Sequence, residues 1–71
     1  MTDTDLLPFL NRRVFAKVQG DPPYMDAGVL WRDHDGRRFL YRLAPSSPRA
    51  LEFASSFPQF TADQIDEIEL V

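Results

Sequence analysis

The stretch AGVLWRDHDGRRFLYRL, residues 27–43, decides the fold predicted for this chain. It contains two runs rich in branched and aromatic residues, 27–33 and 37–43, on either side of a short polar connection. Such residues favour strands, and a short connection with a glycine is typical of a hairpin. We therefore predict two antiparallel strands with a bend at residues 34–36, where Gly36 supplies a left-handed backbone angle.

A further strand is predicted before this hairpin, over residues 12–19. Val14, Ala16 and Val18 recur there at the two-residue period of a strand that is buried on one face. The connecting stretch GDPPYMD, residues 20–26, contains two prolines, which have no amide hydrogen to donate to a sheet. We expect this stretch to be a loop.

The segment DLLPFL, residues 5–10, predicts one or two turns of helix ahead of the first strand. Thr4 and Asp5 are both suitable N-cap residues, because their side-chain oxygens accept hydrogen bonds from free backbone amides. Pro8 is tolerated only in the first turn of a helix, so we expect the helix to start near Asp5 and to be short.

The C-terminal third is less regular. In residues 44–60, Ser47 followed by Pro48 resembles a helix start, whereas Leu51 and Phe53 suit a short edge strand. Both readings remain open, and we favour the strand.

The last strand is expected after a single helical turn, because Thr61 and Gln64 have the spacing of a capping box. Ile65 and Ile68 differ in parity, so a regular strand through both would place them on opposite faces. We therefore place the strand at residues 67–71 and expect the chain still to be turning at Ile65.

These elements predict a single domain of the mainly β class over residues 1–71. A short N-terminal helix followed by five short strands indicates a small five-stranded β-barrel, closed or partly closed. A chain of this length buries a small core, and without cysteine it has neither disulfides nor thiolate metal sites. Support from a homo-oligomer is therefore favoured.

The order of the elements resembles the Sm-like family of small barrels, which share the wider Src-homology-type architecture. The residues that carry the resemblance are LLPFLNRRVFAKV, the following loop, AGVLWRDHDGRRFLYRL with Gly28 and Leu30, and a final IEL strand. Counted from Gly28, His34 stands at the position of the family's aspartate and Arg38 at that of its RNA-contacting asparagine. No Arg-Gly pair precedes the last strand. The resemblance therefore implies a barrel and a ring or other oligomer, and not uridine recognition.

The net charge of −3 is unevenly distributed. Residues 12–49 carry eight bases against four acids, whereas residues 1–11 and 50–71 together carry seven acids and no base. The acidic ends weaken the attraction of the middle for phosphate, so strong non-specific nucleic-acid binding is not expected. MTDTD is unlike a secretory signal, and no apolar run approaches the roughly 18 residues of a membrane span. We expect a cytoplasmic protein without membrane association.

No catalytic residue, metal site or cofactor is predicted. His34 is the only histidine, and its neighbours Asp33 and Asp35 would point away from it on a strand. The serines have no evident base to activate them as nucleophiles. We therefore expect a protein that is not an enzyme.

Two groups of residues are candidates for binding. Tyr24, Met25 and Trp31 include types enriched at the centres of protein interfaces, and an exposed strand edge near them would allow pairing with a protein or a second copy. The second group is a face of guanidiniums, which suits phosphates and nucleobases and which parity along the hairpin assigns to Arg32, Arg38 and Arg42. Our leading hypothesis is a non-enzymatic protein-binding module with an accessory or inhibitor role. The alternative is a weak binder of single-stranded nucleic acid or a nucleotide.

Overall fold

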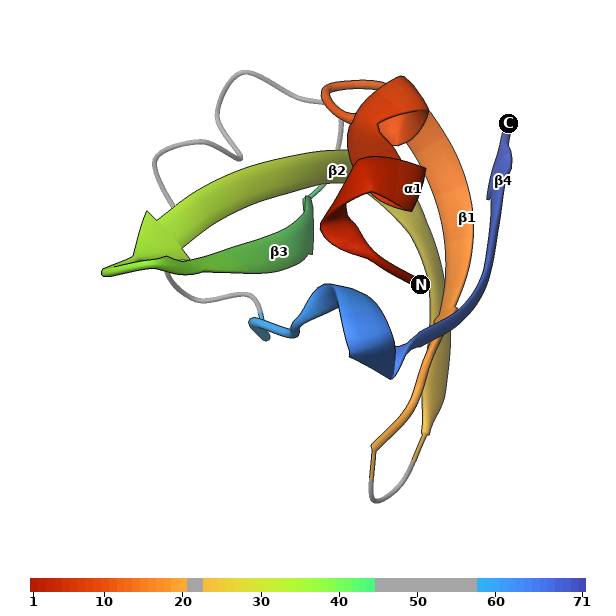
Figure 1. The fold of residues 1–71 in the computed structure, drawn as a ribbon. Helices are drawn as coiled ribbons and strands as arrows, with labels where there is room; N and C mark the ends of the chain where they lie inside the picture. The colour runs from red at the N-terminus through yellow and green to blue at the C-terminus, as the bar shows by residue number, and fades with distance from the viewer. Residues whose placement is uncertain (21–22, 45–57) are drawn as a thin grey trace.

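The computed structural model describes residues 1–20, 23–44 and 58–71. It is mainly β, as predicted, with one four-stranded antiparallel sheet in the order β3-β2-β1-β4 (Figure 1). Its elements are α1 (Asp3–Leu6), η1 (Leu7–Phe9), β1 (Arg13–Val18), β2 (Tyr24–Asp35), β3 (Arg38–Ala44), η3 (Ala62–Gln64) and β4 (Ile65–Leu70).

The predicted barrel is not formed by the described part of the chain, because its sheet stays open between β3 and β4. Five strands are not shown there either. The stretch for which a further strand was favoured falls almost wholly within residues 45–57, which lie outside the described residues. The described part of the chain contains no helix long and apolar enough to cross a membrane.

The first strand, β1, confirms the alternation read from the sequence. Val14, Ala16 and Val18 are fully or almost fully buried, and Phe15 faces the opposite side of the sheet. β1 is central, since it pairs with β2 on one side and β4 on the other.

β2 begins earlier than predicted. Tyr24, Met25 and Asp26 pair with β1, so the predicted loop over residues 20–26 is wrong for these three positions. Proline prevents pairing only where its own amide is needed, and the strand starts directly after Pro23. The N-terminal half of β2 pairs with β1 and its C-terminal half pairs with β3.

The hairpin is confirmed, but its bend is shorter and later than predicted. His34 pairs with Phe39 and Asp35 with Arg38, so the connection is only Gly36 and the residue after it. Gly36 has φ +64°, as the first position of a two-residue type II′ turn requires. This turn matches the twist of the strands, so pairing continues up to Asp35 and Arg38, the residues that flank the turn.

Gly28 lies inside β2. A Cβ atom at this position would lie 2.7 Å from the carbonyl oxygen of Ala44. Gly28 is buried beside the point where β2 changes partner, since its neighbour Val29 pairs with Arg13 of β1 and with Ala44 of β3. The absence of a side chain permits this close approach of two backbones.

The N-terminal helix is short, as predicted, but starts two residues earlier. Thr2, and not Thr4 or Asp5, is the N-cap, because the Thr2 hydroxyl accepts from the Asp5 amide (3.2 Å) and the Asp5 carboxylate accepts from the Thr2 amide (3.0 Å). This reciprocal pair is a capping box. Pro8 lies in η1, where the α-helix has already ended.

The C-terminal turn is confirmed, whereas the start of the last strand is wrong by two residues. Thr61 and Gln64 form the predicted capping box of η3. β4 then starts at Ile65, which lies opposite Val18, while Glu67 lies opposite Lys17. The extra residue between them is a β-bulge, which restores Ile65 and Ile68 to the same face.

The core lies on the concave side of the curved sheet, which wraps around α1 (Figure 1). The phenol of Tyr41 in β3 links the sheet to α1, because its hydroxyl donates to the carboxylate of Asp3 in α1 (2.7 Å). Burial, and then this hydrogen bond, raises the pKa of Tyr41 to about 12. The largest fully buried side chains are Tyr41, Leu6, Leu30, Val14 and Val18.

Candidate functional site

β4 forms the open edge of the described sheet. It pairs with β1 on one side, and none of the residues placed by the structure pairs with its other side. The opposite edge, β3, is partly covered, because Tyr41 and Phe60 exchange two backbone hydrogen bonds of 2.8 and 3.0 Å. An edge strand with free backbone groups is a template for another strand.

The backbone groups on this edge follow from the ladder. The Val71 amide donates to the Arg13 carbonyl (3.1 Å), so the Val71 backbone faces β1. Alternate residues of an antiparallel strand direct their amide and carbonyl groups to the same side. The amide and carbonyl groups of Ile68 and Leu70 therefore point to the open side. No residue in the described ranges pairs with them there, so they offer a site for an added strand.

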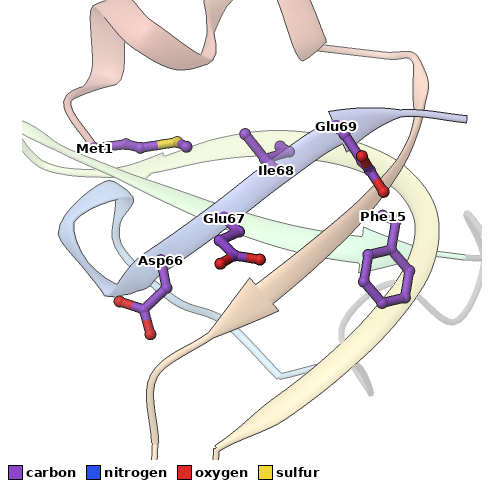
Figure 2. Close-up of a pocket in the computed structure, with 6 residues that line it drawn as sticks. All are labelled: Met1, Phe15, Asp66, Glu67, Ile68 and Glu69. Atoms are coloured by element: carbon purple, nitrogen blue, oxygen red, sulfur yellow. The ribbon is translucent and has the colours of Figure 1, made fainter.

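A pocket of about 350 Å³ lies against β4 at this edge. Figure 2 shows that the carboxylates of β4 project to one side of the strand, whereas Ile68 and Met1 lie on the other side. Phe15 of β1 completes the lining below the strand. The edge thus offers free backbone groups, apolar side chains and carboxylates together. The lining residues are Met1, Phe15, Asp66, Glu67, Ile68 and Glu69.

An apolar surface adjoins the edge on the convex face of the sheet. Phe15 is 37% exposed and lies opposite Ala27, and Met25 is 64% exposed and lies opposite Lys17. We call Phe15, Ala27 and Met25 the outer patch. Large apolar side chains that remain exposed next to an open edge are features of a contact surface.

The open edge is strongly acidic. Asp66, Glu67 and Glu69 are exposed, and no ion pair forms at any of them within the described residues. Asp66 accepts a hydrogen bond from the Gln19 side chain, and Lys17 lies across the ladder from Glu67 without forming an ion pair. The field at this edge therefore favours a cationic group.

The first group of candidate residues is spread along β2. Tyr24 is its first residue and Met25 belongs to the outer patch. Trp31 lies six residues beyond Met25, a contour of roughly 20 Å at the rise of a strand. The structure therefore brings Met25, but not Trp31, to the neighbourhood of the open edge.

The predicted arginine face is wrong, because the hairpin register divides the three guanidiniums. Arg32 lies opposite the buried Tyr41, with its guanidinium 4.3 Å from the centre of the Phe39 ring, on the core side. Odd residues of β2 lie opposite even residues of β3, so Arg38 and Arg42 lie on the other face. The prediction assumed that residues of equal parity in β2 and β3 share a face. The two-residue turn instead places residues of opposite parity side by side.

The other two arginines have neighbours of their own. Arg38 forms an ion pair with Asp35 (4.0 Å), and both side chains are largely exposed. Arg42 lies opposite Trp31, and its Nε is 3.3 Å from the Gln59 amide oxygen when that oxygen faces Arg42. The structure thus offers two separate guanidiniums on this face rather than a row of three.

Asp33, His34 and Asp35 do not converge. The His34 side chain lies on the core side of β2, and the side chains of Asp33 and Asp35 lie on the convex side, since side chains alternate along a strand. The Asp33 carboxylate accepts a hydrogen bond from the His34 amide (2.8 Å). Within residues 1–20, 23–44 and 58–71 no three metal-binding side chains form a group.

Phe15 and the carboxylates of β4 were not among the binding candidates from the sequence. The signal for Phe15 was present, because burial of Val14 and Ala16 requires Phe15 to face the opposite side. The role of β4 had no such signal, because the place of a strand in a sheet depends on pairing with distant residues.

Comparison with known proteins finds no matching protein family, no matching curated protein and no matching solved structure. The Sm-like resemblance therefore stays a prediction.

Proposed function

We propose that the chain is a non-enzymatic binding module that captures another protein by adding an extended segment of that protein to the open edge of β4. The observation that carries the proposal is the geometry of this edge, where Ile68 and Leu70 direct backbone groups outward beside a pocket. Strand addition draws its affinity from such backbone groups and its specificity from side-chain pockets.

The outer patch supplies an apolar anchor for the same partner. Phe15 lines the edge pocket and also belongs to the outer patch, so the two surfaces are continuous. Buried aromatic side chains carry much of the binding energy of protein interfaces. An accessory or inhibitor role in the cytoplasm suits a small binding module without cysteine.

Binding of a nucleotide or single-stranded nucleic acid is the weaker alternative. A row of three guanidiniums was its basis, and the hairpin register divides them. Salt separates the two functions, because phosphate binding weakens steeply between low and physiological salt, whereas an apolar protein interface changes little.

The test is a pair of variants at Leu70, whose side chain is 46% exposed. Leu70→Pro removes an outward amide, and Leu70→Ala removes the side chain but keeps that amide. Tagged forms are captured from cells that express the protein and compared by quantitative mass spectrometry, after circular dichroism shows that both fold.

We expect a partner that is retained by the wild type and by Leu70→Ala and is depleted at least about tenfold by Leu70→Pro, a change of about 1.4 kcal/mol. Exchange of Phe15 for Asp is expected to deplete the same partner. Equal retention by Leu70→Pro and Leu70→Ala would show that the edge is not the binding site.

A further inference from the structure

The chemistry of the β4 edge restricts what can bind there. Glu67 and Glu69 lie on the convex side of β4, opposite Lys17 and Phe15 of β1. Ile68 lies on the concave side, opposite Ala16. An added strand therefore meets carboxylates on one face and an apolar surface on the other, with the two-residue period of its own side chains.

The carboxylates are available to a partner. Asp66, Glu67 and Glu69 are exposed, and the only ion pair of the described residues, Arg38–Asp35, lies at the far end of the hairpin. An incoming cation therefore displaces no base of the described residues from these carboxylates. Charge complementarity points to lysine or arginine in the partner.

A second copy of this chain is a poor occupant. Antiparallel pairing of two β4 strands brings the Glu67 and Glu69 side chains of both copies to one face of the joint sheet, and parallel pairing places the carboxylates of each copy on the apolar Ile68 face of the other. Like charges opposite one another across a sheet are destabilising. β4 has only six residues, which leaves little room for a shifted register. Acidic side chains on an edge are a known protection against self-pairing.

We infer that the partner segment at the β4 edge is an extended basic strand, with lysine or arginine at every second position and apolar residues between them. This inference rests on the proposed function and names the class of partner. The basic side chains lie over Glu67 and Glu69, and the apolar ones lie over Ile68 and Met1. The backbone of the strand pairs with the outward groups of Ile68 and Leu70.

The probe is a fluorescein-labelled peptide of eight residues that alternates lysine and valine, titrated with the protein and followed by fluorescence anisotropy at low and physiological salt. A glutamate–valine peptide of the same length serves as the opposite charge. We expect saturable binding of the basic peptide, weakened by salt, and none of the acidic one.

Three variants separate charge from backbone pairing. The double change Glu67→Gln and Glu69→Gln is expected to weaken binding of the basic peptide about tenfold, because it removes two cross-strand charge pairs. The matched control Asp33→Asn with Asp35→Asn removes the same charge from the far end of β2 and is expected to leave the affinity within about twofold. Leu70→Pro is expected to weaken binding strongly, through the backbone.

The outcomes distinguish the two proposals. Loss of binding with Leu70→Pro but not with the glutamine pair would overturn the basic partner and keep the open edge as the binding site. Equal loss with the glutamine pair and the asparagine control would also overturn it, since only net charge would matter. A dimer in analytical ultracentrifugation that Leu70→Pro dissociates would identify a second copy as the occupant. Unchanged binding by Leu70→Pro would contradict the edge itself.

Discussion

Gly28 is the residue at which one added methyl group would meet the backbone of another strand. Its Cβ would lie 2.7 Å from the Ala44 carbonyl oxygen and 3.2 Å from the carbonyl carbon. Neither atom is able to move aside without shifting β3. The close approach of β3 to β2 at this point therefore depends on this glycine.

At this residue scale we expect Gly28→Ala to lower the free energy of unfolding by about 1–3 kcal/mol, the usual cost of overpacking. Urea denaturation followed by circular dichroism measures it. The control is Ala27→Ser, which adds one atom at the neighbouring, exposed position of the same strand and is expected to change stability by no more than about 0.5 kcal/mol. If both variants were equally stable, the close approach at Gly28 would not constrain the fold.

At the scale of a single element, the β-bulge in β4 determines which side chains reach the core. Ile65 lies opposite Val18 and Glu67 lies opposite Lys17. Asp66, between them, has no residue of β1 opposite it in the ladder. Ile65 is 2% exposed, so its place in the core depends on this extra residue. Without it, Ile65 would move to the convex face.

Deletion of Asp66 is therefore expected to cost about 2–5 kcal/mol, comparable to removing a buried isoleucine side chain. Asp66→Ala keeps the residue count and is expected to change stability by no more than about 0.5 kcal/mol. Thermal and urea denaturation of the two variants would compare them. A deletion variant as stable as Asp66→Ala would mean that β4 re-registers without loss.

At the scale of the whole molecule, the Tyr41–Asp3 hydrogen bond joins the N-terminal helix to the far strand of the sheet. The pKa of Tyr41 rises from 10.0 to about 12, chiefly through burial. Below pH 10 the phenol is protonated in both the folded and the unfolded states, and the contribution to stability is complete. Between pH 10 and about 12 the unfolded state loses this proton first, so stability falls as pH rises.

We expect Tyr41→Phe to cost about 1 kcal/mol at pH 8, through the lost hydrogen bond. Between pH 8 and 11 the variant should lose less stability than the wild type, because the titrating phenol is absent. Urea midpoints at the two pH values measure this difference, because every other titrating group is common to the two proteins. An equal loss of unfolding free energy in the two proteins would show that Tyr41 does not cause the fall in stability at high pH.

Local patterns in the sequence determined several features of this protein. The alternation of Val14, Ala16 and Val18 predicted β1, the spacing of Thr61 and Gln64 predicted η3, and the hairpin composition predicted β2 with β3. Each depends on contacts within a few residues or on the period of one strand, and the structure confirms each.

Features that depend on pairing between distant residues required the tertiary structure. The start of β2 at Tyr24, the bulge at Asp66 and the division of the arginines all follow from register, and a shift of one residue exchanges the two faces of a strand. The candidate site is of this kind. Sequence alone showed that β4 is acidic, whereas only the sheet order made it an open edge, because an edge is defined by the strands that are not beside it.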